Sequence, residues 1–560
     1  MNPYARKSLK WNGWGWNNTH YDFGGSEASF WPFLKAELGC ENLSPSPPVA
    51  LNELNLPPSG LSETLLAELD TTLTPAQCCT DAYERVFHAR GRSFADLLDL
   101  RHGQLGLLPD AVLYPERAEQ VAALLALARR EKLALIPFGG GSSVVGGVNP
   151  PQQQTAHQAV LTLDLSRMKR LLKLDPVSLT ATFEAGIYGP QLENILQARG
   201  FSLGHTPQSF EFSTLGGWIA ARGAGDRSNR YGKMENLLVA ARVLTPAGEW
   251  RTWELPASAA GPDLKHLIAG SEGLFGVITE ATVRIHPLPV ARHHTGFLFH
   301  SFAEGVEALR QLAQSAHPPA MLRLSDEAET HFLFCFRQKP GKASASAKVL
   351  KKMLAWRGLA QHPALLLLGL EGDHSEVWPV LPLLTASCVR SGGFPLGSKA
   401  GESWSQSRYS TPYLRDTLMD QGIGVETLET ATTWSRLLPL YEAVKTTLQT
   451  AIDQQLAAPQ RGFVMTHVSH CYPEGASLYF TFAWPMSQTW AERQAQYQAI
   501  KNAACETLAA HEATLSHHHG LGAAHAPWLA REKGPLGKAV LQAIKAEVDP
   551  EGLMNPGKWF

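Results

Sequence analysis

The chain has 560 residues, of which 44% are hydrophobic and 18% are charged, with a net charge of −2. This composition excludes an intrinsically disordered protein, because it supplies enough apolar residues for a large core, and the balanced charge offers no basic surface for nucleic acid. The longest strongly apolar run, residues 364–370, is too short to cross a bilayer. The seven cysteines form no CxxC pair, and the first residues contain no apolar signal sequence. These features predict a cytoplasmic protein with reduced thiols and no zinc site.

The first half of the chain changes from a helical pattern to alternating strands and helices. Residues 1–100 are predicted to form an N-terminal helical region, with a loop rich in Pro, Ser and Asn at 41–60. Residues 101–290 then alternate between strand and helix, as α/β domains do. The predicted elements are an extended segment at 111–115, a helix at 116–132, strands at 133–138, 160–168 and 179–187, and a helix at 188–200.

The second half of the chain has a different pattern of predicted elements. Residues 291–505 contain longer helical patterns together with long strands at 291–302 and 476–484, which predicts a second α+β domain. Residues 506–560 return to short motifs and are predicted to form a separate C-terminal segment.

Three glycine-rich segments stand out, at residues 137–147, 204–225 and 270–289. Glycines let a backbone approach a phosphate closely, and successive N–H groups can surround an anion. The first segment fits neither GxGxxG nor a Walker loop, since Gly147 stands where a Walker loop has Lys. Plain turns or tight packing between elements would also explain each segment taken alone.

Taken in order, the three segments resemble the FAD-binding half of the vanillyl-alcohol oxidase and p-cresol methylhydroxylase family. The ending DPEGLMNPGKWF, residues 549–560, is similar to the C-terminus of that family, which closes over the cofactor domain. The resemblance implies an α+β fold of two domains: an FAD-binding domain at 101–290, completed by the segment 506–560, and an α+β cap domain at 291–505. The flavin is expected to lie at their interface and to be bound non-covalently.

The resemblance also implies which residues contact FAD. These are Pro137, Phe138, Gly139, Gly140, Gly141, Ser142, Ser143, His205, Gln208, Ser209, Phe210, Glu211, Phe212, Ser213, Thr214, Ala221, Arg222, Gly223, Ala224, Glu272, Gly273, Leu274, Phe275, Gly276, Val277 and Ile278. The chain departs from the family pattern at Gln208, at Ser142 and at Leu274–Phe275, where Asp, Thr and Thr-Leu are usual. These changes are mild, and the loops keep their glycines.

Several rarer motifs are similar to one branch of this family, the alkyldihydroxyacetonephosphate synthases. They are KWNGWGWNN at 10–18, EFSTLGGW at 211–218, RLSD at 323–326, YLRD at 413–416, LYF around Tyr479 and LSHHHG at 515–520. The similarity extends from about residue 8 to the end of the chain. The eukaryotic targeting region and a C-terminal Ser-Lys-Leu are absent, which favours a bacterial protein.

The resemblance to this branch implies a transferase without net redox change. A fatty alcohol replaces the acyl group of acyl-dihydroxyacetone phosphate, and the flavin splits one difficult displacement into two steps. Tyr479 matches the catalytic tyrosine of the branch, and His518 matches a residue expected to favour its phenolate. His517 and His519 are expected to hold the same loop. Arg415 matches the arginine that binds the substrate phosphate, and Arg323 matches another arginine needed for activity.

Other readings stay open from the residues alone. Tyr479 fits a core aromatic on a strand, the histidines fit a solvated loop, and each arginine fits a surface ion pair. An FAD-dependent dehydrogenase or oxidase acting on a 2-hydroxy acid or an alcohol is the main alternative function. A non-catalytic metal- or lipid-binding protein is a third. A homodimer and peripheral contact with the inner face of a membrane are expected from the family and from the insolubility of the substrates.

Overall fold

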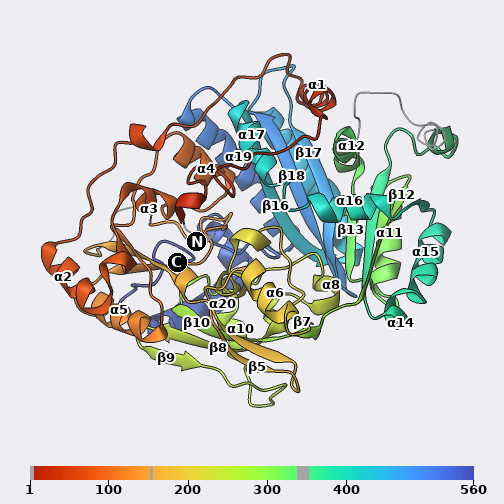
Figure 1. Ribbon diagram of the computed structural model, residues 1–560. Helices are drawn as coiled ribbons and strands as arrows, with labels where there is room; N and C mark the ends of the chain where they lie inside the picture. Colours follow the sequence, from red (N-terminus) through yellow and green to blue (C-terminus); the bar gives the residue numbers. More distant parts are fainter. Residues whose placement is uncertain (1–5, 152–155, 337–351) are drawn as a thin grey trace.

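The computed structural model describes residues 6–151, 156–336 and 352–560. Among these residues the strands form four sheets, three of which carry the core of the protein (Figure 1). The fourth pairs only β7 (Phe201–Ser202) with β11 (His286–Pro287).

The first sheet has the strand order β1-β2-β4-β3. The strands β2 (Ala111–Leu113), β3 (Ala134–Phe138) and β4 (Val160–Asp164) are parallel, and the edge strand β1 (Cys78–Cys79) is antiparallel to β2. The helices α2 (Glu63–Thr72) and α5 (Ala118–Glu131) cover it through a cluster of buried leucines. Because β3 is buried on both faces, its sequence is a continuous apolar run.

The second sheet is antiparallel, in the order β5-β6-β10-β8-β9. Its strands are β5 (Leu171–Asp175), β6 (Thr180–Glu184), β8 (Leu238–Thr245), β9 (Gly248–Arg251) and β10 (Val277–Arg284). The helices of this region are α6 (Gly189–Gln197), α7 (Leu215–Ala220), α8 (Ser228–Tyr231), α9 (Met234–Leu237) and α10 (Lys265–Ile268). A separate apolar cluster fills the space between this sheet and its helices.

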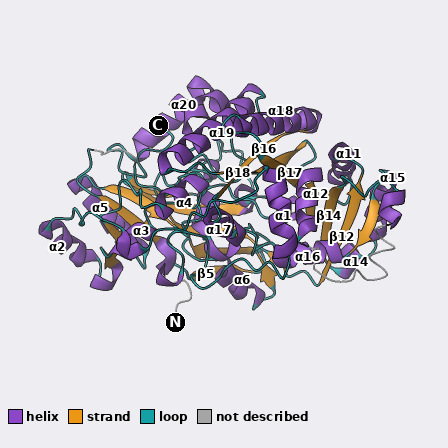
Figure 2. Cartoon of the chain, turned by 90° about the horizontal axis from the view of Figure 1, so that it is seen from above, coloured by secondary structure: helices purple, strands orange, loops and turns teal. Residues whose placement is uncertain are grey.

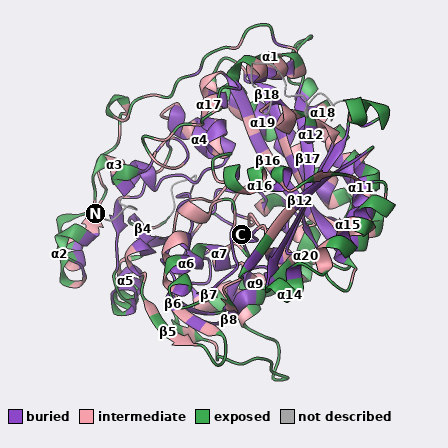
Figure 3. Ribbon diagram, turned by 45° about the vertical axis from the view of Figure 1, so that its right-hand side comes forward, coloured by how far each residue is buried: buried purple, intermediate pink, exposed green. Residues whose placement is uncertain are grey.

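The third sheet is the largest and has the order β15-β12-β14-β13-β17-β18-β16, with neighbouring strands antiparallel. Its strands are β12 (Ala291–Phe299), β13 (Met321–Ser325), β14 (Ala364–Gly372), β15 (Phe394–Gly397), β16 (Ile423–Thr433), β17 (Phe463–Cys471) and β18 (Gly475–Pro485). Figure 3 shows the central strands buried beneath helices whose outer faces are exposed, whereas the edge strand β15 stays partly exposed.

Helices cover both faces of the third sheet. One face packs on α11 (Phe302–Ala313) and α18 (Trp434–Asp453), with α19 (Trp490–Ala510) packed against α18. The helices α12 (Glu327–Cys335), α16 (Lys399–Ser407) and α17 (Tyr413–Asp420) contact strands of the sheet, and Figure 2 places α16 and α17 on the side away from α18. Other helices are α1 (Glu27–Leu38), α3 (Ala82–Phe87), α4 (Phe94–Arg101), α14 (His374–Val377), α15 (Val380–Arg390) and α20 (Leu529–Val548).

The predicted α+β fold class is confirmed, and the strongly patterned elements lie where the sequence predicts them. Several boundaries differ, such as that of the strand predicted at 291–302, which ends at Phe299, and two differences have a clear physical reason. The strand predicted at 160–168 ends at Asp164, because its side chain accepts a hydrogen bond from the Ser166 amide (2.9 Å) and starts a short 3-10 turn. The strand β1 lies inside the region predicted as helical, since a two-residue edge strand leaves no periodic pattern.

Candidate active site

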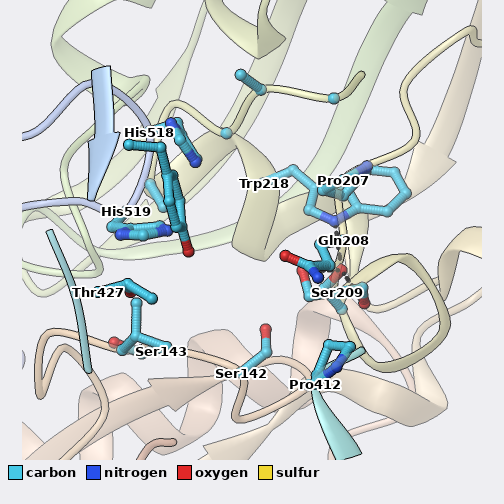
Figure 4. Close-up of a pocket in the computed structure, with 18 of the residues that line it drawn as sticks. Ser142, Ser143, Pro207, Gln208, Ser209, Trp218, Pro412, Thr427, His518 and His519 are labelled. Carbon is cyan, nitrogen blue, oxygen red and sulfur yellow. Dashed lines mark hydrogen bonds between the residues drawn. The ribbon is translucent and has the colours of Figure 1, made fainter. Parts of the chain in front are cut away.

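A cavity of about 520 Å³ lies between the glycine-rich loops of the first half of the chain and the inner face of the third sheet. The glycine loop, residues 137–147, forms one wall, and the segment 207–226 forms another. Figure 4 shows Ser142 and Ser143 of the glycine loop along the lower edge of the cavity, with His518 and His519 above on one side and Gln208 and Ser209 on the other. No helix among the described residues is long and apolar enough to cross a membrane.

The glycine loop presents free backbone donors to the cavity. Within the described part of the chain, the amides of residues 139–144 donate no hydrogen bond to a protein acceptor. A Cβ on Gly140 would lie 1.8 Å from the Phe212 carbonyl oxygen, and Gly141 has a φ of +70°, so this backbone tolerates only glycine. A row of unpaired amides beside glycines is the arrangement that binds phosphate oxygens, and it fits the pyrophosphate of FAD.

Most of the residues predicted to contact FAD line the cavity. They are Pro137, Phe138, Gly139, Gly140, Gly141, Ser142, Ser143, Gln208, Ser209, Ser213, Thr214, Ala221, Gly223, Ala224, Glu272, Gly273, Gly276 and Ile278. The cavity lining does not include His205, Phe210, Glu211, Phe212, Arg222, Leu274, Phe275 and Val277. The prediction covered contiguous stretches, and alternate residues of such stretches face away from the cavity.

The C-terminal segment fastens two of these loops together. Asn555 donates through Nδ2 to the carbonyl oxygens of Gly147 (2.9 Å) and Glu272 (2.7 Å). Trp559 donates through its indole N–H to the Glu272 carboxylate (2.6 Å), which also accepts from the Gly522 amide. Burial raises the pKa of Glu272 to about 7, although these donors act in the opposite direction. The spacing between the loops therefore depends on Asn555 and Trp559.

Tyr479 stands in a row of polar side chains that runs across three neighbouring strands. In the register of the sheet, His467 of β17 lies opposite Tyr479 of β18, which in turn lies opposite Glu429 of β16. Side chains in such a row project from the same face of a sheet, and this face lines the cavity. The Tyr479 ring is stacked between His467, with ring centroids 4.8 Å apart, and His518, at 5.9 Å.

The Glu429 carboxylate organises the three histidines. It accepts hydrogen bonds from the backbone amides of His517 (2.5 Å), His518 (3.1 Å) and His519 (2.9 Å), and from the Ser516 hydroxyl (2.7 Å). His518 and His519 turn their side chains to the cavity, whereas His517 lies behind them and contacts the Tyr472 hydroxyl (2.6 Å). The triple histidine is thus a tight turn built around one buried carboxylate.

The electrostatic setting differs from the expected cation beside a phenolate. Burial lowers the pKa of His518 well below its usual value, and Glu429 only partly opposes this. Burial also raises the pKa of Tyr479 to about 12, although a hydrogen bond to Thr427 lowers it. Burial alone would raise the pKa of Glu429, but the hydrogen bond from the Ser516 hydroxyl opposes this, and the pKa lies well below its usual range. We consider Glu429 ionised, because three amides donate to it, and His518 a neutral imidazole beside a protonated phenol.

His470, His517 and His518 bring ring nitrogens within 4.8 Å of one another, as three-histidine metal sites do. Each ring also has a protein partner. His470 is hydrogen-bonded to the Gly225 carbonyl oxygen (3.0 Å) and to the Ser469 hydroxyl (2.8 Å), and the Nδ1 atoms of His517 and His518 are 3.0 Å apart. The cluster is therefore stable as a hydrogen-bonded network without requiring an ion.

The two predicted arginines are held differently. Arg415 of α17 lines the cavity, has no ion-pair partner among the described residues, and its Nε is buried without an acceptor. Arg323 of β13 also lines the cavity, but its guanidinium is paired with Glu329 (2.9 Å). An unpaired guanidinium in a cavity is suited to bind an anion, so Arg415 is the stronger candidate for a phosphate contact.

The N-terminal segment, residues 6–16, connects the motif at 10–18 with the motif at 413–416. Asp416 of α17 accepts from the Trp14 amide (3.0 Å) and pairs with Lys10 (3.1 Å), and the Tyr413 hydroxyl accepts from the Trp16 amide (3.3 Å). These contacts flank Arg415 on its helix. The segment thereby positions the free arginine.

The same segment reaches the glycine loop. The fully buried Arg6 is paired with Asp164 (2.5 Å) and donates to the Gly139 carbonyl oxygen (2.6 Å). One segment thus touches both the loop with free amides and the helix that carries Arg415.

Sequence reasoning missed several residues that shape the site, namely Arg6, Glu329, Asp416, Glu429 and His467. No local signal marks Glu429, because its strand β16 (IGVETLETATT) also contains Glu426 and several threonines. The pairing of His467 with Glu329 joins residues 138 positions apart, and no local pattern predicts it.

Comparison with known proteins shows FAD-related domains in both halves of the chain. A model of the FAD binding domain matches residues 109–254, and a model of the C-terminal domain of FAD linked oxidases matches residues 288–559. A solved structure of p-cresol methylhydroxylase with bound substrate has the same fold, with a TM-score of 0.68 at 16% identity over 90% of this chain and 98% of that one.

Two proteins are much more similar. A solved structure of an alkyldihydroxyacetonephosphate synthase aligns with a TM-score of 0.83 at 31% identity, covering 98% of this chain and 99% of that one. The alkyldihydroxyacetonephosphate synthase of Dictyostelium discoideum is 34% identical over 99% of this chain and 93% of its own length. The chain therefore belongs to the alkyldihydroxyacetonephosphate synthase family and carries its FAD-binding domain.

Proposed function

We propose that this protein is an FAD-dependent transferase that replaces the acyl group of acyl-dihydroxyacetone phosphate with a long-chain fatty alcohol. The observation that carries the proposal is the meeting of four features in one cavity. Free amides fit a pyrophosphate, the unpaired Arg415 fits a substrate phosphate, the rings of Tyr479 and His518 are stacked with centroids 5.9 Å apart, and an apolar wall fits an alkyl chain.

The apolar wall follows from the alternation of the third sheet. Beyond the polar row, the cavity face of β17 continues with Met465 and Phe463, and α1, α12, α17 and β16 add further apolar side chains. These are Leu34, Phe332, Leu333, Leu414, Leu418 and Val425. An unbranched chain buries about 0.8 kcal/mol per methylene against such a surface, which supports a lipid substrate over a small hydroxy acid.

FAD, when bound, supplies reactivity at its N5 atom that activates the ester-bearing carbon of the substrate. The residues of this chain bind, orient and move protons. The amides of the glycine loop would hold the pyrophosphate, and Arg415 would hold the substrate phosphate. A neutral His518 can accept a proton that Tyr479 relays from the activated carbon, whereas an imidazolium could not. Glu429 then stabilises the charge that His518 gains.

The proposal is tested without an electron acceptor. The purified protein is mixed anaerobically with palmitoyl-dihydroxyacetone phosphate and labelled hexadecanol, and labelled ether product and free palmitate are measured. Several turnovers per enzyme are expected. No product, together with a flavin that is reduced by hydroxy acids and reoxidised by oxygen or a quinone, would instead support the dehydrogenase.

Several finer expectations belong to the same proposal. The flavin is non-covalent, the protein is a cytoplasmic homodimer, and it contacts the membrane from which its substrates come. The proposed division is a helical region at 1–100, an FAD domain at 101–290, a cap at 291–505 and a completing segment at 506–560. The two matched models, at 109–254 and 288–559, support the middle boundary. Release of FAD by acid tests non-covalent binding, the mass in solution tests the homodimer, and sedimentation with anionic vesicles tests the membrane contact.

A further inference from the structure

His467 forms a second carboxylate–imidazole pair in the cavity, on the side of Tyr479 away from His518. Its ring is stacked on Tyr479, with an angle of 18° between the planes. Its Nδ1 lies 2.9 Å from the Glu329 carboxylate of α12. Tyr479 therefore stands between two imidazoles, each next to a buried carboxylate.

The tautomer of His467 follows from its neighbours. Arg323 is paired with Glu329 and holds the pKa of this carboxyl at about 2 against the effect of burial, so Glu329 is ionised. Arg323 Nη2 lies 3.1 Å from the same Nδ1, but it donates to Glu329 at 2.9 Å. Because the ionised carboxylate can only accept and lies nearer to Nδ1, at 2.9 Å, we place the proton of His467 on Nδ1. The Nε2 lone pair is then free, and it has no partner among the residues that the structure describes. His467 lines the cavity, so a ligand there can reach this atom.

The surroundings of His467 indicate which ligand group it meets. Met465 and Phe463 follow it on the same face of β17, and Phe332 and Leu333 belong to the helix that carries Glu329. An alkyl chain lying along this apolar wall would place its polar end at the first polar residue of the row, which is His467. A fatty alcohol bound in this way presents its hydroxyl to Nε2.

The exchange requires two separate proton transfers, and the relay through Tyr479 and His518 accounts for the one at carbon. We propose that His467, oriented by Glu329, is a further catalytic residue that takes the hydroxyl proton of the incoming fatty alcohol. This inference rests on the proposed function. Across the whole exchange, the alcohol oxygen supplies the electron pair of the new C–O bond and its proton passes to Nε2. The fatty acid leaves as a carboxylate with the electron pair of the old C–O bond, and His467 returns the proton to solvent.

The test separates the step at carbon from the step at the alcohol. The substrate is deuterated at the ester-bearing carbon, and washout of deuterium is followed without alcohol, while labelled hexadecanol reports the ether product. For His467→Gln we expect washout within about twofold of the wild type and ether formation at least about 100-fold slower. Tyr479→Phe should lose both signals. His293→Gln, on β12 outside the cavity lining, should retain both.

Two further variants guard against misfolding. Glu329→Gln keeps the size of the side chain but removes the negative charge beside His467 and can turn an N–H donor toward Nδ1, so it should show the same selective loss. Added imidazole should restore ether formation in His467→Gly. Ether formation by His467→Gln within about threefold of the wild type, or equal loss of washout and ether formation, would overturn the inference alone. Absence of ether product from the wild-type protein would overturn the proposed function and this inference with it.

Discussion

Gly15 provides a quantitative test of how the N-terminal segment positions Arg415. Gly15 has a φ of +75°, and a Cβ there would lie 2.1 Å from the Tyr413 hydroxyl oxygen. The left-handed backbone costs an alanine about 1 to 2 kcal/mol, and forcing the methyl against the ring costs about 1 to 3 kcal/mol. Gly15→Ala should therefore lower the free energy of unfolding by about 3 kcal/mol, as measured by urea denaturation.

A matched control separates these two contributions. Gly24 has a φ of +60°, but nothing lies within 4 Å of the Cβ that an alanine would add. Gly24→Ala should therefore show only the backbone cost, about 1 kcal/mol. Because α17 must shift to admit the methyl group, Gly15→Ala should also raise the KM for acyl-dihydroxyacetone phosphate. The reasoning is refuted if Gly15→Ala destabilises the protein no more than Gly24→Ala does.

Three more predictions concern the cavity. Glu429→Gln turns a donor toward the His517 amide and should lower the free energy of unfolding by about 3 kcal/mol in urea. Because the pKa of His518 is lowered and that of Tyr479 is raised to about 12, ether formation should stay constant from about pH 7 to 9 and fall at lower pH as His518 gains a proton. Arg415→Lys loses the bidentate fork and should raise the KM for the phosphorylated substrate at least about tenfold, with kcat less affected; an unchanged KM would exclude the phosphate contact.

Local patterns predicted the elements of this fold well, because their signals are periodic or depend on single residues. The helix at 118–131 and the strand at 475–485 follow from the spacing of their apolar residues. The glycine loop follows from its run of glycines, which is needed where the backbone lies close to neighbouring atoms. The order of the strands in the third sheet was not predictable in this way. It places Glu429 beside Tyr479 and His467 opposite it, and this row assembles the candidate site.

The electrostatic expectation differs from the protonation states that burial favours, for a related reason. An imidazole beside a tyrosine was expected to be a cation, from the ordinary pKa values of the two groups. Burial shifts both values, and burial depends on which helices cover the sheet rather than on the neighbours in sequence. The sequence therefore indicated which residue types belong to the candidate site, but it did not predict their protonation states.

The hydrogen bonds of Asn555 to the two loops have a consequence for when the protein can bind FAD during its synthesis. The amide of Asn555 reaches the Gly147 carbonyl across 408 positions of the chain. A ribosome adding about 5 to 20 residues per second needs roughly 20 to 80 s to cover that stretch. During this time the phosphate-binding loop exists without its fastening. We expect that FAD binds only after translation has passed residue 555. A shortage of FAD would therefore leave full-length protein without its cofactor.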